Sequence, residues 1–183
     1  PACGRVEPKR IVGRKSRNYQ ERLCLRAANA VDGIAGDHYT SVSPFVISFV
    51  ERLPVSTSEA VTQGIRVRVQ AQYDPGRSRP HHNQWFFLYT VRIANESTGT
   101  VQLLSRHWII TDATGHVEEV QGPGVVGEQP VLAPGQYFDY TSGCPLTTPF
   151  GTMHGTYQMV TTQGERFDAQ IAAFTLSEPH SVH

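Results

Sequence analysis

Cysteine is scarce in this chain, and the spacing of the few cysteines excludes two common roles. The three cysteines among the 183 residues are Cys3, Cys24 and Cys144, and no two of them form a C-x-x-C pair. An odd number of widely separated cysteines indicates neither a disulfide framework nor a zinc knuckle. A reducing compartment is therefore expected, with no cysteine-held metal or other cofactor.

Long apolar runs are also missing. The longest, residues 42–50, is interrupted by a proline and two serines. A helix that crosses a bilayer needs about 20 consecutive apolar residues. We therefore expect no membrane insertion.

Surface charge is low and unevenly distributed. Charged residues make up 17% of the chain and sum to a net charge of zero, yet half of the sixteen lysines and arginines lie in residues 1–26. A basic arm on a mildly acidic body is more typical of a solvated segment than of a nucleic-acid groove. Residues 1–58 are thus expected to form a mostly flexible extension with a short helix at 19–31. An Arg-rich, acid-poor start also resembles an organellar transit segment, which is the alternative to a cytoplasmic location.

The remaining residues, 59–183, show the pattern of one all-β domain. Residues 65–73 alternate apolar and polar side chains, as a half-buried strand does. Turn residues then separate further apolar runs every 8 to 12 positions, and residues 56–60 resemble a linker. This pattern predicts an antiparallel β-sandwich of about eight strands, in which residues 142–145 end the strand that begins at residue 136. The expected strands, in addition to 65–73, include 84–94, 101–112, 136–141, 153–161 and 166–176.

The glycines Gly122, Gly124 and Gly127 match G-x-G-x-x-G, but the surroundings do not fit a dinucleotide site. Such a site needs a helix directly after the glycines, and Pro130 and Pro134 deny that helix its backbone donors. The loop is expected to join two strands. Its successive N–H groups also permit an anion nest, which is kept as a hypothesis.

Three arginines extend this hypothesis. Arg66 and Arg68 share one face of a strand by the two-residue period, and Arg106 lies in another expected strand. One guanidinium group can donate two parallel hydrogen bonds to two oxygens of a phosphate. These arginines and the glycine loop would therefore suit pyrophosphate or a nucleotide. The alternative interpretation is a solvated sheet face.

Other candidate chemistry is weaker. His81 and His82 are adjacent in a polar loop, but a metal site needs three or four converging ligands. Cys144 would become a nucleophile only if the fold brought a histidine to it, and nothing local activates its thiol. The histidines considered are His107 and His154, with Asp139 as the orienting carboxylate. Five aromatic residues at strand spacing are expected in the core: Trp85, Phe86, Phe87, Tyr89 and Trp108.

Four segments together resemble the ApaG family. They read VQLLSRHWIITDATG, EVQGPGVVGEQPVLAPG, YTSGCPLTTPFGTMHGTYQM and FDAQIAAFTL, in that order. The resemblance covers residues 60–183. It implies a fibronectin-III or immunoglobulin-like β-sandwich, a stand-alone bacterial protein genetically linked to cobalt and magnesium resistance, and a related partner-binding domain in eukaryotic F-box and polymerase-interacting proteins. It implies no catalytic residues.

The residues and the resemblance together favour a non-enzymatic binding module that recognises an unidentified protein partner. The alternative is a sensor of small anions that uses the glycine loop and the three arginines. Nucleic acid is not the expected partner, and no metal site or cofactor is expected. A homodimer formed through a sheet edge is compatible with this interpretation.

Overall fold

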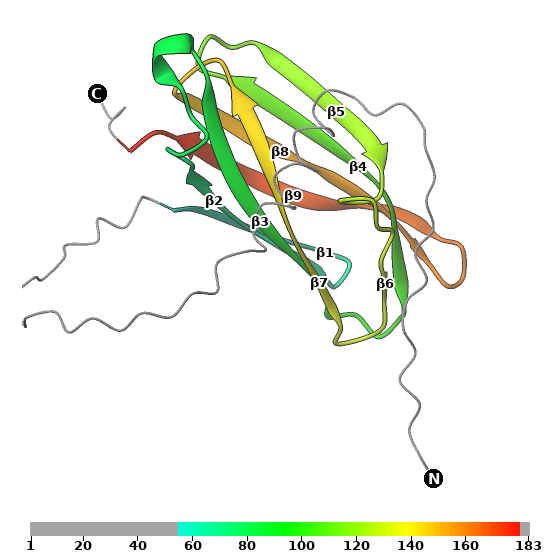
Figure 1. Cartoon of the computed structure of the whole chain (residues 1–183). Helices are drawn as coiled ribbons and strands as arrows, with labels where there is room; N and C mark the ends of the chain where they lie inside the picture. The colour runs from blue at the N-terminus through cyan, green and yellow to red at the C-terminus, as the bar shows by residue number, and fades with distance from the viewer. Residues whose placement is uncertain (1–54, 180–183) are drawn as a thin grey trace, which may run out of the picture.

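The computed structural model describes residues 55–179, which form nine strands and one short 3-10 helix. The strands build two antiparallel sheets that face each other, as Figure 1 shows. The predicted antiparallel β-sandwich is confirmed, with nine strands where about eight were expected. The helix predicted at residues 19–31 and most of the predicted extension lie outside the described residues.

The first sheet has the order β1-β2-β3-β7. The loop between β2 and β3 holds the 3-10 helix η1, Pro80–His82. The strands are β1 (Ser56–Thr62), β2 (Ile65–Tyr73), β3 (Trp85–Asn95) and β7 (Tyr137–Leu146).

The second sheet has the order β5-β4-β8-β9, and the two-residue strand β6 pairs with the start of β4. Its long strands are twelve residues each. The strands are β4 (Val101–Asp112), β5 (Val117–Pro123), β6 (Val131–Leu132), β8 (Phe150–Thr161) and β9 (Arg166–Ser177).

Alternation along the strands separates the core from solvent. In β2, Ile65, Val67 and Val69 are at most 1% exposed, whereas Arg66 and Arg68 lie on the outer face. Successive strand side chains point to opposite faces, so one sheet face is buried and the other is solvated. The predicted strand 65–73 is confirmed to the residue.

Aromatic rings fill the middle of the core. Trp108 of β4 makes edge-to-face contacts with Tyr89, Tyr157 and Phe174, at centroid distances of 5.5 to 6.2 Å. Such contacts contribute beyond the area that they bury. The five aromatic residues predicted to be in the core are all buried.

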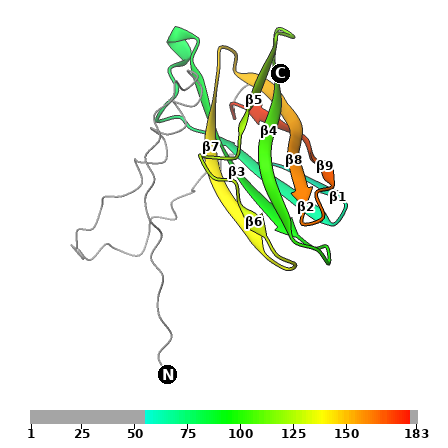
Figure 2. The same ribbon diagram turned by 90° about the vertical axis from the view of Figure 1, so that its right-hand side faces the viewer.

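Hydroxyl groups close one side of the sandwich. Ser58 Oγ of β1 donates to the Ala172 carbonyl of β9 at 2.9 Å, and the Thr175 and Gln170 N–H groups donate to hydroxyls of Ser56 and Thr62. The exposed backbone edge of β9 is thereby capped by side chains of the other sheet. The opposite side carries the edge strands β5 and β7, and Figure 2 shows β7 away from the closely placed β1 and β9.

Two sequence predictions were wrong. Residues 56–60 were expected to be a linker, but they belong to β1, whose serines and threonine bind β9. Residues 142–145 were expected to end a strand, but β7 continues through them to Leu146. Pro145 is tolerated because β7 is an edge strand. Gly143 is required because a Cβ there would lie 2.3 Å from the ring of Phe86.

Candidate functional site

The glycine motif forms a tight turn between β5 and β6. The N–H groups of Val125 and Glu128 each donate to the other's carbonyl at 2.8 Å. The two residues between them, Val126 and Gly127, have φ angles of 44° and 87°, as in a type I′ turn. Val125 itself is fully buried, so the turn inserts one side chain into the core.

Each motif glycine has a structural reason. A Cβ at Gly122 would lie 3.2 Å from the Arg106 guanidinium, and one at Gly124 would lie 2.1 Å from the Glu128 carbonyl oxygen. Gly124 and Gly127 also have positive φ angles, which glycine adopts without steric cost.

Val126 occupies a costly conformation. A β-branched residue with positive φ is a steric outlier, and asparagine is preferred at this turn position. We expect Val126→Asn to raise the free energy of unfolding by about 1 kcal/mol. Urea unfolding would measure the shift in midpoint. Val126→Thr is the matched control, because it adds polarity and keeps the branch; an equal gain from both would contradict the backbone explanation.

Arg106 of β4 lies against this turn. Its Nη1 donates to the carbonyls of Pro123 and Gly124, at 3.2 and 2.8 Å. The guanidinium therefore holds the entry of the turn, with Gly122 leaving room for it. Of the three predicted arginines, the structure brings this one to the glycine loop.

Arg66 and Arg68 lie on the outer face of the other sheet. Arg66 is held between Glu59 and Glu96, with Nε 2.7 Å from Glu96 Oε1, and Arg68 pairs with Glu59. Hydrogen bonds from these arginines lower the pKa of Glu59, chiefly through Arg68, and that of Glu96, chiefly through Arg66. The structure does not bring these two arginines to the glycine loop, and anion binding there stays a prediction.

The residues considered for nucleophilic catalysis are not assembled. Cys144 is 2% exposed on the inner face of β7, whereas Asp139 lies on the outer face of the same strand and binds Arg92. His107 of β4 bonds Glu119 at 2.8 Å. The exposed His81 and His82 lie in η1, and residues 55–179 hold no group of three or more His, Cys, Asp or Glu arranged for a metal ion.

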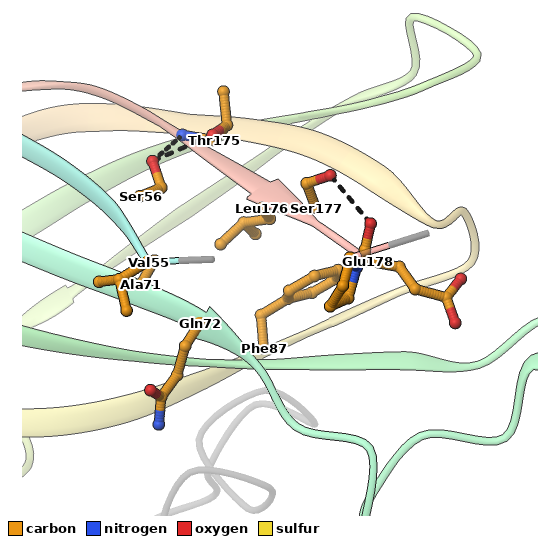
Figure 3. A pocket seen from close by; sticks show the side chains of 10 residues that line it. Val55, Ser56, Ala71, Gln72, Phe87, Thr175, Leu176, Ser177 and Glu178 are labelled. Atoms are coloured by element: carbon orange, nitrogen blue, oxygen red, sulfur yellow. Dashed lines mark hydrogen bonds between the residues drawn. The ribbon is translucent and has the colours of Figure 1, made fainter. Parts of the chain in front are cut away.

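A cavity of about 190 Å³ opens at one end of the sandwich, between β1, β2 and β9. Figure 3 shows Ala71, Phe87 and Leu176 directed toward it, while the carboxylate of Glu178 points away. Glu178 instead accepts a hydrogen bond from the indole of Trp85 at 2.8 Å. An apolar cavity of this size suits one side chain and offers little to an anion.

A second hollow lies beside the start of β7. This groove of about 450 Å³ is lined by residues 130–132 and 135–138, and we call it the β6–β7 groove. Val131 and Tyr137 at its rim are each 58% exposed, the largest values among the exposed large hydrophobic residues described.

Tyr137 is exposed but held in place. The Arg92 guanidinium carbon lies 4.3 Å from the centre of its ring, a cation–π contact. Arg92 is fixed in turn by two hydrogen bonds to Asp139, at 2.8 and 2.6 Å. These bonds raise the pKa of Arg92, so its charge is permanent. We call Tyr137, Arg92, Asp139 and the β6–β7 groove the Tyr137 surface.

The sequence alone did not single out this surface. The alternation of Tyr137, Asp139 and Thr141 was available as a period-two pattern. The partner of Asp139 was not, because Arg92 lies 47 positions earlier and meets it only through the β3–β7 register.

The fold and this geometry define a β-sandwich domain with one side closed by hydroxyl contacts and an ordered tyrosine beside its other side. Comparisons with known proteins show which family of β-sandwich domains this one resembles. Residues 75–161 match the family model described as the ApaG domain. A Protein ApaG from Methylocella silvestris is 58% identical over 120 residues, covering 66% of this chain and 92% of that protein.

A further relative and a solved structure show the same similarity. A Protein ApaG from Beijerinckia indica subsp. indica is 56% identical over 121 residues, covering 66% of this chain and 93% of the relative. The crystal structure of a putative ApaA protein from Bordetella pertussis is 52% identical, with a TM-score of 0.62, and covers 64% of this chain and 95% of that one. The chain belongs to the ApaG family. No helix within residues 55–179 is long and apolar enough to span a membrane.

Proposed function

We propose that the chain is a non-enzymatic binding module that recognises a protein partner through the Tyr137 surface. The observation that carries this proposal is an exposed tyrosine that is already ordered before any partner arrives. Tyrosine and arginine are enriched at the energetic centres of protein interfaces. Because the Arg92–Asp139 pair fixes the ring, little side-chain entropy is lost on binding.

The cellular location of the module and its link to metal resistance are proposed from the family resemblance described in the sequence analysis. The proposal locates it in the cytoplasm and connects it to cobalt and magnesium resistance through the partner. The described residues hold no cluster suited to a metal ion. In this proposal the domain therefore affects metal tolerance through its partner and does not bind the metal itself.

Site-specific photocrosslinking in living cells tests this function. Benzoylphenylalanine placed at Tyr137 is expected to give one discrete crosslinked protein. The control position is Thr57, which is exposed on β1 at the other edge of the same sheet face. The same crosslinked products from both positions, or no crosslinked product from position 137, would contradict the proposal.

The anion-sensor alternative has its own test. Pyrophosphate added to the isotope-labelled full chain would have to produce saturable amide shifts centred on residues 122–127. The binding-module proposal expects no such shifts. Gly124→Val is unsuitable as a binding probe, because a Cβ at Gly124 would clash with the Glu128 carbonyl at 2.1 Å.

A further inference from the structure

We infer that Arg68 and Arg92, which lie opposite each other on the outer face of the β1-β2-β3-β7 sheet, bind one carboxylate of the partner protein. The partner presents an Asp or Glu side chain to these two arginines and an apolar side chain to Tyr137. This inference rests on the proposed function, because Arg92 belongs to the Tyr137 surface and the inference assigns the chemistry of the segment that this surface recognises.

A row of four charged residues crosses this face of the sheet. The strand register gives their order, one residue from each strand, as Glu59, Arg68, Arg92 and Asp139. The carboxylates are at the two ends of the row, and the two positive charges are neighbours in the middle. Opposed residues on antiparallel strands have Cβ atoms about 5 Å apart, and like charges in such positions repel each other. A negative charge placed between the arginines would make the signs alternate along the row and offset this repulsion.

Both arginines keep hydrogen-bond donors that residues 55–179 do not use. Arg68 binds Glu59 through Nε, and its Nη1 and Nη2 donate no hydrogen bond within these residues. Arg92 binds Asp139 through Nε and Nη2, and its Nη1 is unused within the same range. A guanidinium group holds a carboxylate through two parallel N–H groups. Each of the two arginines therefore has one edge of its planar fork left for a second carboxylate.

Arg66, on the same face, differs from these two arginines. Its Nε and Nη2 donate to Glu96 and its Nη1 donates to Glu59, so each of its three nitrogens is used. Its side chain is 27% exposed, against 58% for Arg68 and 49% for Arg92. Glu59 is shared between Arg66 and Arg68, which leaves the charge of Arg68 less fully compensated. The accessible positive charge of this face thus lies at Arg68 and Arg92, and charge complementarity favours an acidic partner segment there.

The next row of the same face joins the arginine pair to the Tyr137 surface. This row contains Ala94 and Tyr137, which the register places opposite each other, and the Tyr137 ring already contacts Arg92. Side chains on one face of a strand repeat every second residue, about 7 Å apart. An extended partner segment has the same repeat, so the residue two positions from its acidic side chain reaches the tyrosine ring. The expected recognition element is therefore an Asp or Glu two positions from a large apolar residue.

Selection from a displayed library of random twelve-residue peptides, with the full chain as bait, tests the inference. Selected peptides are expected to carry an Asp or Glu two positions from an aromatic or large aliphatic residue. The affinity of a synthesised winner should fall about fivefold as salt is raised through the range that screens surface charges.

Two matched variants locate the contact, since each removes one positive charge from the same face. Arg68→Gln should weaken binding of the peptide about fivefold, whereas Arg66→Gln should change it less than about twofold. Replacing the acidic residue of the peptide with its amide should weaken binding to the unchanged chain about tenfold, but to Arg68→Gln only about twofold, because the two changes remove the same contact. Thermal unfolding of both variants checks that the sandwich is retained.

Three results would overturn the inference. The first is a set of selected peptides in which Asp and Glu are not enriched, and the second is an equal loss of affinity in the two arginine variants. The third comes from inorganic phosphate as a competitor: if phosphate displaced the peptide at micromolar concentration, the arginine pair would be assigned to a free phosphate ligand and not to a carboxylate of a protein.

Photocrosslinking separates this inference from the proposed function. With benzoylphenylalanine at position 137, Arg68→Gln is expected to lower the yield of the discrete crosslinked protein about fivefold, and Arg66→Gln to keep it. A crosslinked protein whose yield is the same in both variants would leave the binding module standing and remove the acidic contact. Absence of the crosslinked protein from the chain that keeps all its arginines would remove both proposals.

Discussion

Replacing Asn95 with alanine is expected to lower the free energy of unfolding by about 3 kcal/mol, since several buried hydrogen bonds disappear together. Asn95 is fully buried at the end of β3. Its Nδ2 donates to the carbonyls of Gly99 and Leu132, each at 2.8 Å, and its Oδ1 accepts from the N–H and hydroxyl of Ser97. Alanine would leave the Leu132 carbonyl in the core without this donor.

Chemical denaturation of the purified chain would measure the loss. Ser97→Ala is the matched control, because it removes one hydroxyl contact to Asn95 Oδ1 and leaves the two carbonyl contacts intact. The control should cost about 1 kcal/mol or less. Equal losses in the two variants would show that Asn95 does not connect β3 with the segment before β7.

Gly155→Ala is expected to lower the free energy of unfolding by about 3 kcal/mol or more, because the added methyl group overpacks two paired strands. Gly155 of β8 lies opposite Trp108 of β4. A Cβ at this position would be 2.0 Å from the His107 carbonyl oxygen and 3.1 Å from its carbon. These are backbone atoms, so relief requires β4 to move away at the residue beside the central tryptophan.

Thermal unfolding of Gly155→Ala would be compared with that of an alanine substitution at a glycine that has free space around it. This comparison isolates the steric cause. Gly99→Ala introduces the same methyl group where no atom lies within 4 Å. It should change the free energy of unfolding by no more than about 0.5 kcal/mol. If Gly155→Ala were as mild as Gly99→Ala, the close approach of β4 and β8 would be refuted.

The sequence predicted the sandwich wherever one face of a strand is buried. Residues 65–73 and 101–112 were bounded correctly, because burial forces a visible alternation or a dense apolar run between turn residues. The glycine loop was also correctly placed between strands.

The two edge strands were harder for a physical reason. β1 contains serines and threonines whose partners are backbone atoms of β9 more than 100 positions away, so its composition resembles that of a linker. β7 contains Gly143 and Pro145, which end most strands. Their tolerance depends on the ring of Phe86 and on the position of β7 at the end of its sheet, as far as residues 55–179 define that sheet.

The candidate site was predicted only in part. The sequence grouped Arg66, Arg68 and Arg106 by their chemistry, but sheet membership separates them: the first two face solvent beside Glu59, and the third reaches the glycine turn. Residue type indicates which ligand a side chain could bind. The register of the sheets determines which side chains meet.

The hydroxyl contacts between β1 and β9 also limit how copies of this domain can combine. Growth of an open-ended filament by edge pairing needs two accepting sides on every unit, one for the neighbour before and one for the neighbour after. With β9 covered by side chains of β1, its edge cannot serve as one of these two sides, so a filament cannot grow through β9. A chain that lost residues 56–62 would uncover the β9 edge and allow another strand to pair there.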